Sequence, residues 1–289
     1  MEVGIMMPIN FVLVRHGESE GNVANRRSRR GDNRHFTEGF RKRPSSQWRL
    51  TTRGEWQVRE SGLWIRKNIM TRFDRRTTSS HIRAMGSAYQ LEVLGPPWHV
   101  DYNLRERDYG QLDLLTDEER RDQFASDMER KETDPFLWAP GGGESMASVA
   151  LRLRAPISTL HRECSDMNVI WVCHGEVMWT VRILLERMTP WRYLELHASK
   201  DPHHRINNAQ VIHYTRRDPV TGEPSHKLEW VRSVCPWDIE RSNNEWQRIH
   251  RPTFTDQELR EEIESAPYSS RVFFYKRFAL GQGFFYRTK

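Results

Sequence analysis

Cysteine is scarce in this chain of 289 residues, and its scarcity argues against two kinds of protein. Cys164, Cys173 and Cys235 are too few, and odd in number, for a disulfide framework. Their spacing also matches no metal site. We therefore expect the protein to work in a reducing compartment.

Long apolar runs, an export signal and internal repeats are also missing. No apolar run reaches the length that crosses a bilayer, and the N-terminal segment carries Glu2 without a basic leader or a small-residue cleavage site. No repeat recurs at the spacing of a solenoid. The missing membrane and export signals predict a cytoplasmic protein with no membrane partner. The length of 289 residues suits one large domain, or one domain with sizeable insertions.

Acidic residues are depleted locally rather than over the whole chain. The chain has 45 Lys and Arg against 39 Asp and Glu, a net charge of +6. Ten Lys or Arg fall between residues 26 and 53, where only Asp32 and Glu38 are acidic. Such a local field favours an anionic partner. The arginines from 26 to 30 have no aromatic residues between them for stacking on bases, which disfavours nucleic acid as the partner.

Hydrophobic patterning predicts an α/β fold. Continuously apolar runs at 9–14 and 168–173 predict fully buried strands. Strands that alternate with helices indicate a three-layer αβα sandwich with a mostly parallel central sheet. Thr51 or Thr52 is expected to cap the first long helix, with Glu55 as the capping-box partner of Thr52. The other expected strands are 76–80, 209–214 and 226–232, and the expected helices are 52–69, 83–94, 117–132, 144–164 and 176–188.

Two regions depart from this alternation of strands and helices. Residues 23–50 are polar, Arg-rich and interrupted by Gly and Pro, which predicts a long loop inserted into the domain. The predicted domain spans 8–235, and 236–289 is a C-terminal extension expected to pack on it. The extension carries a charged helical stretch at 255–265 and an aromatic-basic run at 272–287. This run is a candidate contact surface, which leaves a homodimer open.

Two of the buried strands end in the same way. The first runs into Arg15, His16 and Gly17, and the second runs into His174 and Gly175. The carboxyl ends of neighbouring parallel strands meet at one edge of a sheet, so both histidines are expected at a single crevice. A glycine after each histidine allows the backbone to approach a ligand closely.

Imidazole and guanidinium groups placed together suit phosphoryl transfer. A neutral imidazole is a nucleophile near pH 7, and arginine offers a fork of donors to an oxyanion. The reaction also needs an acid for the leaving oxygen, and it gains from a second arginine. The candidates are Arg83 as the second arginine, Glu106 as the acid with Glu18 and Asp108 as rivals, and Asn22 and Ser19 as further hydrogen-bond donors.

Seven short motifs, in chain order, resemble those of the histidine phosphatase superfamily, the phosphoglycerate mutase-like proteins. R-H-G-E-S at 15–19 with Asn22 resembles the R-H-G-E-x-x-x-N signature. The second histidine is followed by Gly175 rather than Asp, so the chain resembles the branch that excludes acid phosphatases and phytases. The other matching motifs are L-T-x-x-G at 50–54, S-x-x-R-A at 80–84, L-x-E with a following Gly at 104–110, G-E-S at 143–145, V-C-H-G at 172–175 and N-A at 208–209.

This resemblance implies a phosphomonoester hydrolase that uses no metal and no other cofactor. The substrate would be a small, anionic phosphorylated molecule. His16 would become phosphorylated, and Glu106 would first protonate the leaving group and then activate water. The residues that would hold the phosphoryl oxygens are Arg15, Arg83, His174 and Gly175, with Asn22 and Ser19 assisting.

Two alternatives stay open at this point. A mutase would use the same pocket, although the E-N-R-F-x-G-W and R-R-S-Y patterns that the family's mutases carry after the positions of Asn22 and Glu106 are missing. A non-catalytic phosphate-binding or scaffolding module is the second alternative. The Arg-rich stretch 26–53 is expected either to select a multiply charged substrate or to be a solvated loop.

Overall fold

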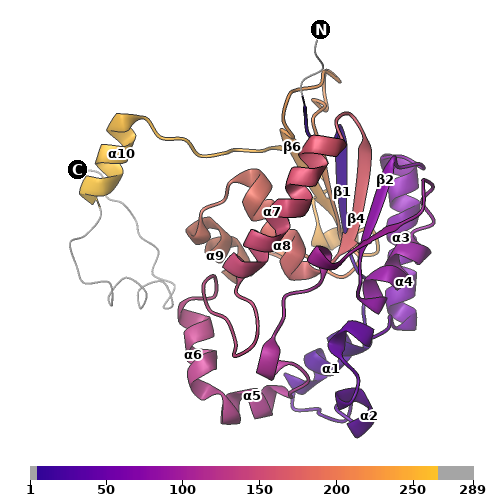
Figure 1. The fold of residues 1–289 in the computed structure, drawn as a ribbon, viewed down its shortest axis with the longest axis vertical. Helices are drawn as coiled ribbons and strands as arrows, with labels where there is room; N and C mark the ends of the chain where they lie inside the picture. Colours follow the sequence, from indigo (N-terminus) through magenta and orange to yellow (C-terminus); the bar gives the residue numbers. More distant parts are fainter. Residues whose placement is uncertain (1–4, 266–289) are drawn as a thin grey trace.

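A seven-stranded sheet organises the computed structural model, which describes residues 5–265 (Figure 1). The strand order is β3-β2-β4-β1-β5-β6-β7. The first four strands in this order run parallel, and the last three pair antiparallel along one side. The predicted α/β fold with a parallel centre is therefore confirmed. The strands are β1 Asn10–Arg15, β2 Arg75–Ser79, β3 His99–Asp101, β4 Asn168–Cys173, β5 Val211–Thr215, β6 Trp230–Val234 and β7 Gln247–Arg248.

Alternate side chains of β1 supply two separate cores, one on each face of the sheet. Phe11 and Leu13 belong to the larger cluster, and Val12 and Val14 belong to the smaller one. All four side chains are fully buried. A strand with no solvated face needs a continuous apolar run, which explains why β1 and β4 were predictable from sequence.

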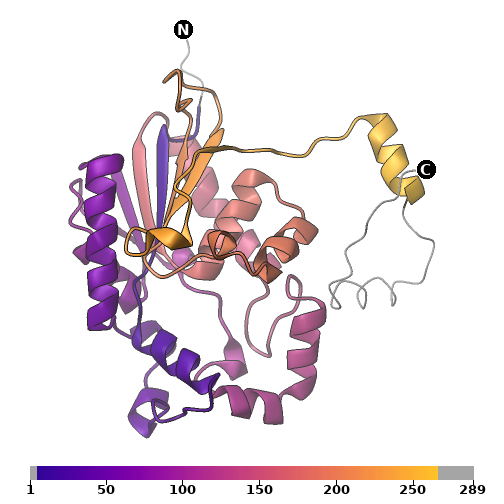
Figure 2. The ribbon, with the colours of Figure 1, turned by 180° about the vertical axis from the view of Figure 1, so that it is seen from behind.

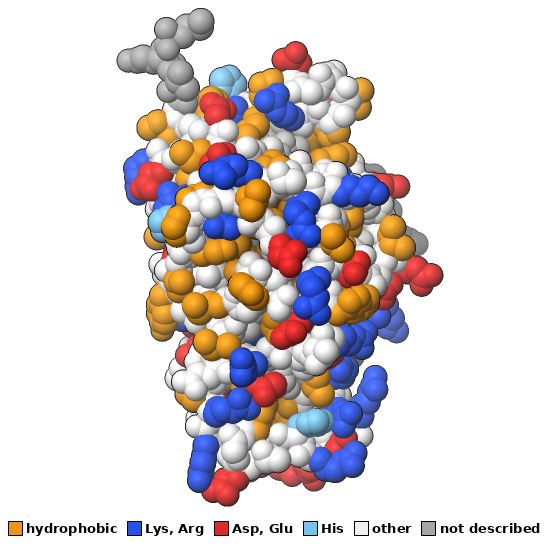
Figure 3. All heavy atoms as spheres, turned by 90° about the vertical axis from the view of Figure 1, so that its right-hand side faces the viewer, with side chains coloured by type: hydrophobic (Ala, Val, Ile, Leu, Met, Phe, Trp, Pro, Cys, Tyr) orange, Lys and Arg blue, Asp and Glu red, His pale blue; other side chains and the backbone are white. Residues whose placement is uncertain are grey.

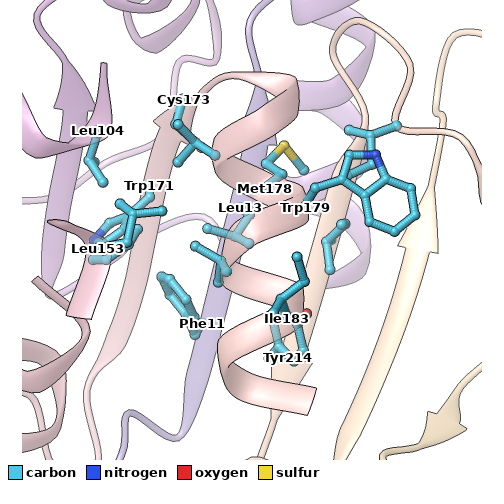
Figure 4. Packing of buried hydrophobic residues seen from close by; sticks show 14 of the residues in the cluster. Phe11, Leu13, Leu104, Leu153, Trp171, Cys173, Met178, Trp179, Ile183 and Tyr214 are labelled. Carbon is cyan, nitrogen blue, oxygen red and sulfur yellow. The ribbon is translucent and has the colours of Figure 1, made fainter. Parts of the chain in front are cut away.

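Helices cover both faces, so the domain has three layers (Figures 1 and 2). The larger cluster lies between the sheet and α7, α8 and α9 (Figure 4), and the smaller one lies under α3 and α4. The helices of the described residues are α1 Glu20–Ser28, α2 Glu38–Arg41, α3 Thr52–Asn68, α4 Ile82–Gln90, α5 Asp117–Gln123, α6 Ala125–Thr133, α7 Met146–Glu163, α8 Gly175–Glu186, α9 Pro190–Ala198 and α10 Asp256–Ser265.

The segment 23–50 is not the loop that its composition predicted. It contains most of α1, all of α2 and a third, small hydrophobic cluster, in which Phe40 stacks on Trp48 with ring centroids 4.8 Å apart. A capping box between Ser19 and Asn22 starts α1. The Arg-rich composition hid these elements because most of the basic side chains stay exposed while a few aromatic residues form the core.

Several predicted element boundaries were wrong for local reasons. The helix expected at 83–94 ends at Gln90, because Glu92 takes a left-handed conformation with φ 51°. The helix expected at 117–132 is interrupted at Phe124, which separates α5 from α6. Thr51 is the cap of α3 and accepts from the amide of Gly54 at 3.0 Å, so the proposed capping box does not form.

The strand expected at 226–232 begins later, at residue 230. Residues 218–223 form a turn in which the Asp218 amide donates to the Glu223 carbonyl at 2.9 Å, and pairing with β5 starts only at Trp230. None of the helices in the described part of the chain is long and apolar enough to span a bilayer. On the face shown in Figure 3, basic, acidic and hydrophobic side chains are interspersed.

The C-terminal extension contacts the domain along its first part. Trp237 packs against the smaller core, Ile249 packs against the larger one, and the Trp246 ring lies 4.9 Å from that of His213. The predicted helix at 255–265 is present as α10, which has no buried residue and lies away from the sheet (Figure 1). The aromatic-basic run 272–287 lies outside the described residues. The division of the chain at residue 235 stays a prediction.

Candidate active site

The ends of β1 and β4 bring the two predicted histidines together. The strands pair in parallel with Arg15 opposite Cys173, so the residues that follow them leave the sheet side by side. The His16 amide donates to the Cys173 carbonyl at 2.9 Å. The rings of His16 and His174 lie 5.1 Å apart, centroid to centroid. The expected meeting of two distant histidines at one sheet edge is therefore present.

The hydrogen bonds of His16 determine which ring nitrogen is free. Nδ1 lies 2.7 Å from the carbonyl oxygen of Gly17, which can only accept, so Nδ1 carries the proton. Nε2 is then the atom with a lone pair, and Arg83 Nε donates to it at 3.2 Å. Burial, followed by the charges of Arg83 and Arg15, holds the pKa of His16 well below its usual value. The imidazole is therefore neutral and nucleophilic at neutral pH.

His174 is fully buried beside His16, with one ring nitrogen bound and one unpartnered. Nε2 lies 2.8 Å from the hydroxyl oxygen of Ser79, and the buried Nδ1 has no hydrogen-bond partner among the described residues. Burial, then the charge of Arg83, lowers the pKa of His174 well below its usual value. A buried nitrogen without a partner is costly unless a ligand occupies it.

Arg15 and Arg83 are both fixed by backbone carbonyls. Arg15 donates to Ile206 at 2.6 Å, and Arg83 donates to Ser45 at 2.7 Å. Burial lowers the pKa of both, that of Arg83 to about 10, yet both stay charged at neutral pH. Arg15 Nε, like His174 Nδ1, is a buried nitrogen without a hydrogen-bond partner in the described structure. Two fixed guanidiniums and two imidazoles thus surround a space suited to an oxyanion.

Close backbone packing requires the glycine that follows His16. A Cβ on Gly17 would overlap the carbonyl of Gly54, at the start of α3. The second predicted glycine, Gly175, lines the cavity, and a Cβ there would lie 3.4 Å from Arg15 Nε.

Glu106 is the carboxyl group best placed to act as an acid. It lines the same cavity as His16, and burial, followed by the nearby charge of Glu176, raises its pKa. The two rivals are placed differently. Glu18 forms an ion pair with Arg26 at 2.7 Å and does not line the cavity, whereas Asp108 lines it but is exposed and accepts from the amide of Gly110.

Ser19 and Asn22 line the cavity but are also engaged in local structure. The Ser19 hydroxyl caps α1, and Asn22 Oδ1 accepts from the Ser19 amide at 3.1 Å and from Asn208 Nδ2 at 3.0 Å. Asn208 also donates to the carbonyl of His16 at 3.2 Å, so it supports the turn after β1. This pattern leaves the Asn22 amide nitrogen available to a ligand, whereas Ser19 is primarily a helix cap.

Sequence reasoning missed several residues of the cavity wall, among them His81, Tyr109 and Glu176. The His81 ring lies 4.8 Å from that of His174, and its Nδ1 is buried without a partner in the described residues. The Tyr109 hydroxyl donates to Glu176 at 3.4 Å. Proximity in sequence to Arg83, Glu106 and His174 was the signal that could have identified them.

The cavity has a volume of about 750 Å³ and a wall rich in positive charge. Among the described residues, Arg29, Arg120 and Lys131 reach this wall without an ion-pair partner. Burial, followed by the charges of Arg107 and Arg120, lowers the pKa of Lys131, so these cations lie near one another. Nothing in the polar helical stretch 117–132 distinguished Arg120 and Lys131 from surface residues.

One group of side chains also has the spacing of metal ligands. Ligand atoms of His16, Glu106 and His174 lie within 4.8 Å of one another. Arg83 already donates to the free nitrogen of His16, and Arg15 lies in the same wall. Two adjacent guanidiniums repel a cation, so these residues fit an anion better than a metal ion.

Comparison with known proteins identifies a match over most of the chain. A family model described as "Histidine phosphatase superfamily (branch 1)" matches residues 11–217. A 2,3-bisphosphoglycerate-dependent phosphoglycerate mutase of Methylorubrum populi is 30% identical over 188 residues, which cover 62% of this chain and 80% of the mutase. A 6-phosphofructo-2-kinase/fructose-2,6-bisphosphatase of Aquarana catesbeiana is 28% identical over 208 residues, which cover 72% of this chain but 38% of that protein.

Solved structures share the fold at lower identity. A mycobacterial glucosyl-3-phosphoglycerate phosphatase matches with a TM-score of 0.55 and 22% identity, over 71% of this chain and 92% of that one. A phosphoserine phosphatase of Entamoeba histolytica matches with a TM-score of 0.53 and 20% identity, over 75% and 93% of the two chains.

Proposed function

The chain belongs to branch 1 of the histidine phosphatase superfamily, and from that premise we propose that it hydrolyses phosphomonoesters through a phosphohistidine at His16. One observation carries the proposal: the Nε2 lone pair of a neutral, buried His16 faces a guanidinium and a second imidazole. An imidazole held this way is a nucleophile beside an electrostatic site for the group it attacks.

In the first step, His16 Nε2 attacks phosphorus and the bond from phosphorus to the leaving oxygen breaks. Glu106 gives its proton to that oxygen. The raised pKa of Glu106 keeps this carboxyl group protonated at a higher pH than an ordinary glutamate. Arg15, Arg83 and His174 stabilise the charge on the phosphoryl oxygens. The products of this step are an alcohol and phosphohistidine.

In the second step, water attacks phosphorus and the bond to His16 Nε2 breaks. The Glu106 carboxylate, deprotonated by the first step, takes a proton from the water. Inorganic phosphate then leaves, and His16 and Glu106 return to their starting states. The same two residues therefore serve both halves of the reaction.

The unpaired cations of the wall support a substrate with a second anionic group. Arg29 belongs to the stretch 26–53, for which selection of a multiply charged substrate was one expectation, and the structure adds Arg120 and Lys131 to the same wall. Arg27 and Arg30 do not line the cavity. We expect an Arg120→Gln, Lys131→Gln double variant to lose discrimination between singly and multiply charged phosphomonoesters, and an Arg27→Gln, Arg30→Gln control to keep it.

A phosphoglycerate mutase activity is the second candidate, because a mutase is among the relatives at 30% identity. A hydrolase releases inorganic phosphate, whereas a mutase returns an isomer of its substrate. The deciding experiment incubates the protein with a panel of phosphorylated metabolites and measures free phosphate and isomerised product together. Phosphate release without isomers supports the hydrolase, and isomers in excess of phosphate would contradict it.

A further inference from the structure

Glu176 places an unused hydrogen-bond acceptor in the cavity wall. It lies in the first turn of α8, two residues after His174, and lines the same cavity as His16. Its Oε1 accepts from the Tyr109 hydroxyl at 3.4 Å. Its Oε2 is buried and has no hydrogen-bond partner within residues 5–265. An unpaired buried carboxylate oxygen is costly, so a ligand that supplies a donor is the natural partner.

Glu176 shares the cavity with Glu106, the proposed proton donor, and acts on it electrostatically. A proton donor must stand beside the leaving oxygen, and Glu106 is the proposed donor. The charge of Glu176 acts on Glu106, on Tyr109 and on Arg15, so the carboxylate is close to all three. The ring of Trp179, which lines the cavity and follows Glu176 by less than one helical turn, adds an apolar surface to the same wall.

The charges around Glu176 favour a neutral donor over a cationic one. Burial lowers the pKa of Lys131, and the charges of Arg107, Arg120 and Arg29 lower it further while Glu176 partly opposes them, so Lys131 lies near Glu176 and among these three arginines. An ammonium group on the substrate would meet the repulsion of these cations. A hydroxyl group can donate to Glu176 Oε2 without that penalty.

We propose that Glu176 accepts a hydrogen bond from a hydroxyl group on the leaving portion of the substrate, and that this contact makes the protein selective for hydroxylated phosphomonoesters. The inference rests on the proposed hydrolase function. It makes Glu176 a specificity-determining residue and the substrate a phosphorylated alcohol that carries at least one further hydroxyl.

Three substrates with the same three-carbon chain test the inference: propyl phosphate, hydroxypropyl phosphate and aminopropyl phosphate. We expect kcat/KM of the unmodified protein to be highest for hydroxypropyl phosphate, by at least about tenfold over propyl phosphate. Glu176→Leu should abolish this preference. Glu176→Gln keeps a carbonyl acceptor and should retain part of it. The control is Glu240→Leu, at an exposed carboxylate outside the cavity, which should leave the ratio unchanged.

The possible outcomes separate this inference from the function on which it rests. Equal kcat/KM for the hydroxyl and propyl compounds, a preference for the amine, or an unchanged ratio in Glu176→Leu would each overturn the role of Glu176. In all three cases phosphate would still be released, and the hydrolase would stand. Absence of phosphate release from any substrate, with no phosphorylated protein, would instead contradict the hydrolase. Because the test compares kcat/KM ratios within each variant, a smaller fraction of folded protein in Glu176→Leu would lower all three values alike and leave the ratio interpretable.

Discussion

At the scale of single residues, the site depends on which groups are charged before substrate arrives. Burial and neighbouring arginines keep His16 and His174 neutral, whereas burial and Glu176 favour the protonated form of Glu106. These opposite shifts give a neutral nucleophile and a protonated acid at the same pH. Pairs of groups whose environments shift their pKa values in this way are typical of acid–base catalysis.

The pH dependence of kcat/KM tests this assignment. The His16 pKa lies well below its usual value, so the acidic limb should fall below about pH 6.5, the ordinary value for histidine. The Glu106 pKa is raised, so the alkaline limb should mark the loss of its proton. Glu106→Gln should lower kcat/KM by about 10²–10⁴-fold for an alkyl phosphate and remove the alkaline limb. Asp108→Asn, at the exposed rival acid, should keep the profile; loss of the limb in that variant would contradict the assignment.

A leaving group that needs no proton gives an independent test of Glu106. With p-nitrophenyl phosphate the first step should be nearly insensitive to Glu106→Gln, because nitrophenolate leaves unprotonated. The second step still needs the base that activates water. The variant should therefore show a rapid burst of nitrophenolate followed by slow turnover, and an equally slow first step would contradict the proposed role.

At the scale of elements, the site depends on how closely α3 and α4 pack against the loops that carry its residues. Gly54 of α3 lies against the backbone of Glu18, and Gly62 of α3 lies against the carbonyl of Leu91, directly after α4. Arg83 is on α4, so its position relative to His16 follows from this packing. Glycine lowers the helix propensity of α3, but it allows the backbone of a neighbouring segment to approach the helix closely.

Gly62→Ala separates these two effects. Helix propensity alone predicts a gain of about 1 kcal/mol in the free energy of unfolding. The new methyl group would overlap the Leu91 carbonyl, so we expect a net loss of about 1–3 kcal/mol in urea denaturation. Gly39→Ala, in α2, is the matched control because nothing lies within 4 Å of the added carbon. An increase in the stability of Gly62→Ala would refute the close packing of α3 on the end of α4.

The elements that the sequence predicted well are those with an unambiguous hydrophobic pattern. β1 and β4 are buried on both faces, so their continuous apolar runs and the convergence of His16 with His174 were readable. α1 was missed because its surface arginines conceal a small buried face. β3 and β7 are too short to carry a pattern. Lys131 looked like any solvated lysine, since its burial against two aromatic rings arises only from the tertiary structure.

At the scale of the whole molecule, buried neutral histidines link stability to pH. The pKa values of His16, His174 and His213 are all well below the value of about 6.5 expected in an unfolded chain. Below that pH the unfolded chain binds protons that the folded chain excludes, so the free energy of unfolding decreases as the pH falls. The stabilisation from these three histidines is fully present above the histidine pKa of the unfolded chain, and it is lost as the pH falls below that pKa.

His213→Gln measures one part of this linkage away from the candidate active site. His213 is on β5, and its Nε2 lies 2.9 Å from Asn10 Oδ1. The free energy of unfolding of the unmodified protein should fall between about pH 7.5 and about pH 5.5. In His213→Gln this decrease should be smaller by about 1 kcal/mol. Urea denaturation at the two pH values provides the measurement. A slope equal to that of the unmodified protein would mean that His213 titrates alike in both states.

The central claim, phosphorylation of His16, is tested most directly by trapping the phosphoprotein. The protein is mixed with a labelled phosphomonoester that the panel identifies as a substrate, quenched within one turnover and digested. The account predicts an acid-labile, base-stable label on the peptide that contains His16, present in His213→Gln and absent in His16→Ala. A label on another residue, or sustained phosphate release by His16→Ala, would contradict it.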